Sequence, residues 1–234
     1  MLKHLPNAMT CANLLCGCLG IVQVFEGELT IASWLILLAA VLDFLDGFVA
    51  RALRAQSPIG KELDSLADCV TFGVLPAFIM FSLLRSPDTE IMKGDTASLL
   101  PYLSFSLAVF SALRLAKFNI DTRQSDSFIG VPTPANAMVI AALPLILAYQ
   151  PEYANWVLNP YVLYAYTLLM SYLLVAELPL FALKFKTFSW RKNRIKFIFL
   201  IVSALLLLIL RFAAVPLIIF LYILLSVFAP KQNA

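Results

Sequence analysis

The sequence is short of charged side chains and contains a single histidine, His4. Only 13% of its 234 residues are Asp, Glu, Lys or Arg, whereas a typical soluble domain has about 25%. Together with 62% apolar residues and a mean hydropathy of +0.89, this shortage excludes an ordinary soluble domain and indicates an integral membrane protein. One histidine near the N-terminus also argues against a histidine-based metal site and against a Ser-His-Asp triad.

Cysteine pairs and surplus basic residues are missing as well. The four cysteines, Cys11, Cys16, Cys18 and Cys69, form no CxxC pair and lack the spacing of zinc ligands. We therefore expect four small buried apolar side chains rather than a metal or redox site. No basic face remains once the loops are assigned, so we expect no nucleic-acid partner. The N-terminal segment lacks a small-residue cleavage site, so we expect no cleaved signal peptide.

Long apolar runs dominate what is present. A helix that crosses a bilayer needs about 20 mostly apolar residues, and this length predicts eight transmembrane helices in an all-α polytopic bundle. The predicted spans are 8–25, 30–53, 61–84, 98–118, 133–149, 157–176, 195–211 and 213–229. Almost nothing separates the last two, and their apolar runs contain no ionisable residue, so we expect a tight helical hairpin that faces lipid.

Lysine and arginine are distributed unequally between the two sides of this topology. Eight spans place both termini on one side, and 14 of the 17 Lys and Arg residues fall there. Cytoplasmic loops of membrane proteins carry the excess of positive charge. We therefore expect the protein in the cytoplasmic membrane, with both termini in the cytoplasm. The basic segment 184–196 has two interpretations: a loop held by anionic headgroups, or a surface helix that gathers an anionic lipid substrate.

Four aspartates interrupt the second and third predicted spans. Asp43 and Asp46 are three residues apart, and Asp64 and Asp68 are four apart, so each pair shares one face of its helix. Two antiparallel helices joined by a short loop can turn these faces toward each other. We therefore expect four carboxylates around one small volume near the cytoplasmic end of the bundle, and ionisable residues inside a membrane are by default a functional site.

Carboxylates gathered in one volume need protons or cations to offset their repulsion. Interhelical ion pairs are one alternative, but Arg51 and Lys61 can serve only two of the four aspartates. Hard divalent cations suit an all-carboxylate site, so we expect Mg²⁺ or Mn²⁺. Gly47 and Ala50 leave room beside the second helix, while Arg51 and the SPIG turn (57–60) offer donors. Metals, an arginine and open backbone together predict a pyrophosphate site, with the active site on the cytoplasmic side.

The spacing of these residues forms a known pattern. DxxDGxxAR at 43–51, followed after eight residues by GxxxDxxxD at 60–68, resembles the complete signature of the CDP-alcohol phosphotransferases. The resemblance implies a six-helix membrane core, which residues 1–190 would supply, and makes residues 191–234 a C-terminal two-helix extension. It also implies a homodimer.

The same resemblance implies roles for individual residues. The four aspartates would bind two divalent metal ions that hold the pyrophosphate of a CDP-linked lipid, and Asp68 would also be the general base. The predicted CDP-lipid-binding residues are Asn7, Thr10, Gly47, Ala50, Arg51, Ser57 and Gly60.

Four segments are similar to the integral-membrane phosphatidylserine synthases within this family: 5–17, 62–77, 114–119 and 128–137. This finer resemblance implies CDP-diacylglycerol and L-serine as substrates, with phosphatidylserine and CMP as products. Arg114, Lys117 and Asn119 are the predicted serine-binding residues, and interfacial anchoring is the alternative role for Arg114 and Lys117. Glycerol-3-phosphate and an inositol derivative stay open as acceptors, and a cation transporter is a distant alternative.

Overall fold

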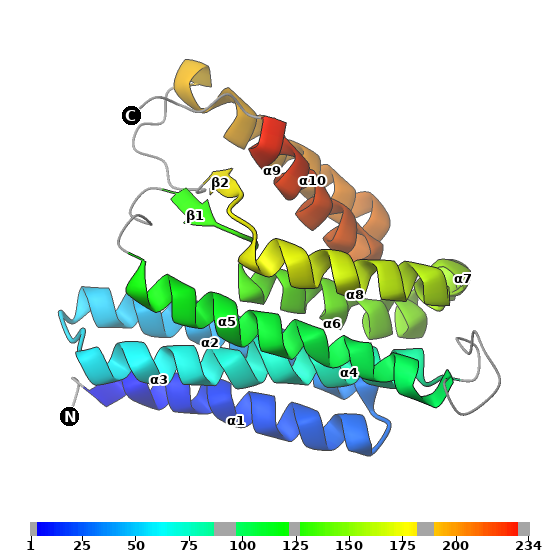
Figure 1. Ribbon diagram of the computed structural model, residues 1–234. Helices are drawn as coiled ribbons and strands as arrows, with labels where there is room; N and C mark the ends of the chain where they lie inside the picture. The colour runs from blue at the N-terminus through cyan, green and yellow to red at the C-terminus, as the bar shows by residue number, and fades with distance from the viewer. Residues whose placement is uncertain (1–3, 87–96, 122–126, 182–189, 229–234) are drawn as a thin grey trace.

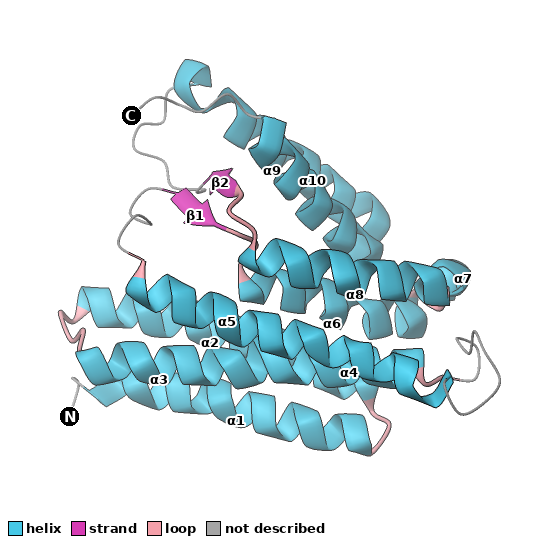
Figure 2. Cartoon of the chain, viewed as in Figure 1, coloured by secondary structure: helices cyan, strands magenta, loops and turns pink. Residues whose placement is uncertain are grey.

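The computed structural model describes residues 4–86, 97–121, 127–181 and 190–228. Within these residues the protein is an all-α bundle, apart from one antiparallel pair of short strands, β1 (Ser127–Ile129) and β2 (Pro179–Phe181) (Figures 1 and 2). The α-helices are α1 (Leu5–Phe25), α2 (Leu29–Ala52), α3 (Pro58–Asp68), α4 (Leu75–Leu84), α5 (Ser106–Ile120), α6 (Thr133–Tyr149), α7 (Ala154–Val157), α8 (Pro160–Val175), α9 (Trp190–Leu210) and α10 (Ala214–Phe228). Shorter turns of other helix types are η2 (Cys69–Val74), η4 (Ala97–Phe105), η5 (Pro151–Tyr153) and η6 (Arg211–Ala213).

Each predicted span coincides with a helix, and the prediction of an all-α membrane bundle is confirmed. Five helical stretches of the described residues are long and apolar enough to cross a membrane, or six if α6 and its continuation, bent by 115°, form one span. The count of eight is not confirmed, for two physical reasons. Helix α8 has only 16 residues, and α9 and α10 run together through η6 as one apolar stretch, Asn193–Val227.

The predicted basic segment 184–196 falls only partly within the structure. Residues 184–189 lie outside the described residues, and the remainder opens α9. Asn193 has non-helical φ and ψ, so the basic start of α9 is set off from its apolar part. At the other end of α9, Arg211 adopts a positive φ of 48° in η6, where the chain turns into α10.

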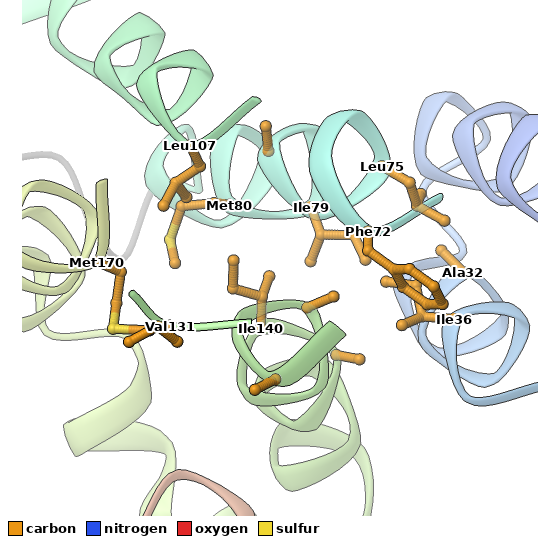
Figure 3. Packing of buried hydrophobic residues seen from close by; sticks show 14 of the residues in the cluster. Ala32, Ile36, Phe72, Leu75, Ile79, Met80, Leu107, Val131, Ile140 and Met170 are labelled. Atoms are coloured by element: carbon orange, nitrogen blue, oxygen red, sulfur yellow. The ribbon is translucent and has the colours of Figure 1, made fainter. Parts of the chain in front are cut away.

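The continuous helix formed by α3, η2 and α4 lies at the centre of the bundle. In its most apolar window 61% of the residues are buried, against 17% in Asn193–Val227, so this helix is core and the C-terminal hairpin is periphery. Figure 3 shows how its buried side chains pack with those of α2, α5, α6 and α8. The labelled residues that make this contact include Ile36, Phe72, Ile79, Met80, Leu107, Ile140 and Met170.

Helix α1 lies at the edge of the bundle, and this position corrects the prediction for its cysteines. Cys16 is buried and Cys69 of η2 is partly buried, as expected, but Cys11 and Cys18 are exposed. The prediction of four buried cysteines was therefore wrong for two of them, because one face of α1 points away from the protein. All four are free thiols.

The π-helical turn η2 follows Asp68 directly and packs against α1. Such turns occur frequently at functional sites. The Thr71 hydroxyl in η2 donates a hydrogen bond to the Asn13 carbonyl at 3.1 Å. One turn along α1, a Cβ added to Gly17 would lie 3.0 Å from the Cα of Thr71. The two helices therefore touch through backbone, and the polar side chains of α1 are brought beside Asp68.

We expect Gly17→Ala to destabilise the protein, because the added methyl group has no space against Thr71. Overpacking of this kind costs about 1–3 kcal/mol, which corresponds to a fall of several degrees in Tm for a chain of this size. Thermal unfolding in detergent measures the change, with Cys18→Ala on the exposed face of α1 as the control. An unchanged Tm for Gly17→Ala would contradict the close approach.

Candidate active site

Helices α2 and α3 run antiparallel and are joined by a short turn (Figure 1). The aspartates lie on the sides of these two helices that face each other. One carboxylate oxygen from each of Asp43, Asp64 and Asp68 lies within 4.8 Å of the other two. Asp68 is buried, with 9% of its surface exposed, and the other two are half-buried. The helical periodicity of the sequence thus brings three of the four aspartates together as expected.

Asp46 takes a different position from the other three aspartates. Its side chain is only 5% exposed and accepts a hydrogen bond from the Thr10 hydroxyl at 2.6 Å. It lies outside the group of three carboxylates and lines the adjoining cavity together with Asp64. The second α2 carboxylate therefore connects the acidic cluster to α1.

Asn13 is a site residue that the sequence analysis missed. Its amide Nδ2 donates a hydrogen bond to Oδ1 of Asp68 at 3.3 Å, and the residue is fully buried. The signal was present, because Asn7, Thr10 and Asn13 recur at intervals of three in an apolar helix, which places them along one face. That polar stripe on α1 faces the aspartates.

The three clustered carboxylates fit a divalent metal ion. Their oxygens are the hard ligands that Mg²⁺ and Mn²⁺ prefer, and their separation allows one ion to contact all three. The two cations considered as ion-pair partners have other contacts. The Lys61 ammonium donates to the Asn119 carbonyl at 3.0 Å, and the Arg51 guanidinium lies over Gly47. The acidic cluster is thus better matched to metal than to these two side chains.

A cavity of about 530 Å³ opens beside the aspartates, between the start of α1, the end of α2 and the start of α3. Its volume is in the range of ordinary ligand sites. It is lined by all seven predicted CDP-lipid-binding residues, which are Asn7, Thr10, Gly47, Ala50, Arg51, Ser57 and Gly60. Lys61 also lines it and was not predicted.

Two glycines keep the wall of this cavity open. A Cβ at Gly60 would lie 3.1 Å from Oδ1 of Asn7 and from the hydroxyl oxygen of Ser57. That hydroxyl caps α3 by accepting a hydrogen bond from the Gly60 amide at 3.1 Å, and Pro58 starts the helix. A Cβ at Gly47 would lie 3.4 Å from Nη1 of Arg51. The small residues therefore let polar groups approach the space where a ligand would sit.

The three predicted serine-binding residues of α5 are placed differently from one another. Arg114 is buried, close enough to Asp68 to interact with it electrostatically, and its guanidinium lies over the Phe118 ring at 5.8 Å. Lys117 is exposed. The Asn119 side chain donates to the Ser65 hydroxyl at 2.9 Å, which fixes it to α3. Of the three, only Arg114 is buried and interacts electrostatically with an aspartate of the acidic cluster.

A sequence model of the CDP-alcohol phosphatidyltransferase family matches residues 3–176, well over half of the chain. The chain belongs to this family. It is 38% identical over 143 residues to the CDP-diacylglycerol–serine O-phosphatidyltransferase of Helicobacter pylori, an alignment that covers 60% of this chain and 57% of the relative. It is 33% identical over 177 residues to the protein of that name from Bacillus subtilis, covering 76% and 89%.

An archaeal relative extends the comparison. The archaetidylserine synthase of Methanothermobacter thermautotrophicus is 31% identical over 156 residues, covering 66% of this chain and 63% of the relative. The chain therefore spans less than two thirds of the length of the Helicobacter pylori and archaeal relatives, and most of the length of the Bacillus subtilis one. The family match covers the aspartates, the cavity and Arg114, and it ends before α9.

We expect Mn²⁺ to raise the Tm of the purified protein by several degrees, because a ligand that binds only the folded state stabilises it. Asp64→Asn should remove most of this rise, since it replaces a charged ligand by a neutral one. Glu62→Gln, an exposed acid on the same helix, is the control and should keep the full shift. Equal shifts in both variants would show that the carboxylate cluster is not the metal site.

Proposed function

We propose that the protein transfers the phosphatidyl group of CDP-diacylglycerol to the hydroxyl of L-serine, giving phosphatidylserine and CMP. The observation that carries the proposal is the three-carboxylate cluster at the edge of a cavity lined by Arg51 and by glycine backbone. Family membership supports the reaction type. The names of the bacterial relatives support serine as the acceptor.

The donor would place its cytidine diphosphate end in the cavity and keep its acyl chains in the bilayer. Arg51 offers a planar fork of N–H donors that matches phosphate oxygens. Asn7 on α1 and Ser57 at the start of α3 contribute an amide and a hydroxyl, both beside Gly60. The pyrophosphate would then lie next to Asp46 and Asp64, at the boundary between the cavity and the acidic cluster.

The four aspartates would hold two divalent metal ions, Mg²⁺ or Mn²⁺. Asp43, Asp64 and Asp68 form the cluster, and Asp46 lies beside it. Metal bound there would neutralise the pyrophosphate and stabilise the negative charge on departing CMP. Thr10 orients Asp46 through its 2.6 Å hydrogen bond, and Asn13 orients Asp68. These contacts hold the carboxylates in place before substrate arrives.

Asp68 would act as the general base. A carboxylate oxygen of Asp68 accepts the proton of the serine hydroxyl while the hydroxyl oxygen attacks the phosphorus that carries the lipid. The P–O bond to the CMP phosphate breaks, and CMP leaves. Asp68 is suited to this role because it is the most buried of the clustered aspartates, and the Asn13 amide occupies only one of its oxygens.

Arg114 would bind the carboxylate of serine. The residue is 7% exposed, and its Nε has no hydrogen-bond partner among the described residues. A buried donor without a partner is costly, so an anionic ligand is the natural complement. Its proximity to Asp68 would place the serine hydroxyl near the base. Lys117 and Asn119 would contribute at the rim, beyond Arg114.

The arrangement in the membrane is part of the same proposal. Eight spans, with residues 1–190 as the family core and 191–234 as an extension, would place both termini and the active site on the side richer in Lys and Arg. This side would be the cytoplasm, with the protein in the cytoplasmic membrane. The N-terminal end of α1, the α2–α3 turn and the two strands lie at one end of the bundle, which supports this topology (Figure 1). A homodimer is expected from the family resemblance.

Acceptor choice is the direct test of the proposed activity. Purified protein with CDP-diacylglycerol and Mn²⁺ should release CMP and form labelled phosphatidylserine when L-serine is added. Glycerol-3-phosphate and inositol phosphate should give little product, because Arg114 alone offers too few cations for a phosphorylated acceptor. CMP release with glycerol-3-phosphate and none with serine would overturn the acceptor while keeping the reaction type.

Asp68→Asn should reduce kcat about 100- to 10,000-fold, the usual contribution of a general base. The amide keeps the size of the carboxyl group, so Tm without metal should stay close to that of the unmodified protein. CMP release under saturating substrates measures the loss. A fully active Asp68→Asn variant would exclude Asp68 as the base.

A further inference from the structure

Lys61, in the first turn of α3, lines the cavity beside the aspartates but has no role in the proposed function. Among the described residues that line this cavity, the only other cation is Arg51, in the last turn of α2. The acids that line it are Asp46 and Asp64. The cavity therefore presents one cation from each of the two helices that carry the aspartates.

A closed set of three hydrogen bonds joins Lys61 to the end of α5. The Lys61 ammonium donates to the Asn119 carbonyl at 3.0 Å, and the Asn119 side chain donates to the Ser65 hydroxyl at 2.9 Å. That hydroxyl donates to the Lys61 carbonyl at 3.2 Å. Asn119 lies in the last turn of α5, where carbonyls have no partner within the helix and favour a cation. The Lys61 side chain is therefore held between the cavity and α5.

Two N–H donors of the Lys61 ammonium have no partner in the described part of the chain. A lysine ammonium has three donors, and the Asn119 carbonyl accepts from one. Lys61 also forms no ion pair with the described residues, although Asp64 follows it by one turn and lines the same cavity. The ammonium is thus held in place at the cavity with donors available to an anionic ligand.

The charge of the proposed donor leaves a place for both cations. The diphosphate of a CDP-linked lipid carries two negative charges, one on each phosphate. The four aspartates already balance the charge of two divalent ions. Arg51 and Lys61 can therefore match the two phosphates from opposite walls of the cavity, since one belongs to α2 and the other to α3.

We propose that Lys61 binds the lipid-bearing phosphate of the donor, the phosphate that the acceptor attacks, while Arg51 binds the phosphate of the CMP group. The inference rests on the proposed function. The attacked phosphate must lie on the side of the acceptor, and α5 carries the proposed acceptor residue Arg114. The start of α3 and the end of α5 lie at the same end of the bundle, and Lys61 joins them (Figure 1). Arg51 instead lies over Gly47 of its own helix.

CDP and CMP test this assignment, because they differ only in the second phosphate, which takes the place of the lipid-bearing one. Calorimetric titration of the detergent-solubilised protein in Mn²⁺ measures both dissociation constants. We expect Lys61→Met to raise the Kd for CDP on the order of tenfold or more, since a hydrogen bond to a charged group is lost. The Kd for CMP should stay within about twofold, the usual range for a neutral surface change. Retained CMP binding also shows that the variant is folded.

Lys61→Arg keeps the charge and should keep most of the affinity for CDP. Arg54→Met is the matched control, since Arg54 is an exposed cation of the α2–α3 turn that does not line the cavity. It should change neither Kd. Equal weakening of CDP and CMP in Lys61→Met, an unchanged Kd for CDP, or the same loss in Arg54→Met would overturn the inference.

Ser65 and Asn119 are positioning residues that act through Lys61. Ser65→Ala removes the hydroxyl between them and should raise the Kd for CDP about two- to tenfold, the contribution of a neutral hydrogen bond. In a Lys61→Met background the same change should add little, because the residues act together. The rise in Tm on adding Mn²⁺ should stay, since Ser65 is not one of the clustered carboxylates. Fully additive effects would contradict the positioning role.

Failure of this inference is distinguishable from failure of the proposed function. CDP binding needs no acceptor, so the comparison of CDP with CMP does not depend on which alcohol the protein uses. A protein that binds CDP but forms no product from serine would contradict the proposed acceptor. The selective loss of CDP binding in Lys61→Met would then still support the inference, and an unselective loss would refute it.

Discussion

The cost of placing carboxylates inside a membrane bundle is the constraint on which the rest of the structure depends. Four aspartates occur within two apolar helices, and a charged group in hydrocarbon is tolerated only when it is neutralised or faces a polar space. Each solution is visible in the fold. Asp46 faces the cavity and receives the Thr10 hydroxyl, Asp68 receives the Asn13 amide, and three carboxylates converge where a cation fits. The polar side chains of α1 provide the aspartates of α2 and α3 with hydrogen bonds that lipid cannot provide.

Much of this site could be predicted because helical periodicity converts sequence spacing directly into shared faces. The intervals of three and four residues between aspartates suffice to gather Asp43, Asp64 and Asp68, and the motif residues around them line one cavity. Asp46 departs from the cluster because the Thr10 hydroxyl on another helix holds it, and spacing along α2 contains no information about α1. Asn13 had a visible signal in its interval of three from Thr10.

The fold was predictable to a similar depth and for the same reason. Apolar length locates each helix, but it does not reveal where a helix bends, shortens or joins its neighbour. The 115° bend after α6 comes at Gln150, whose backbone is non-helical and which precedes Pro151. The 3-10 turn between α9 and α10 is bound by the Gln150 side chain, a tertiary contact that apolar length does not report. A largely apolar stretch such as CVTFGV likewise gives no sign that it winds as a π-helix, because it has no polar face whose spacing would reveal the helix type.

That π-helix sets the rotational phase between two halves of one continuous helix. Asp64 and Asp68 lie on its N-terminal side, and the residues that pack the core, such as Ile79 and Met80, lie on its C-terminal side. Loss of one residue between 69 and 74 would turn the acidic face by about 100° relative to the packed face, the angle per residue of an α-helix. Side chains on either side can therefore drift independently through evolution, while the length of the segment between them cannot.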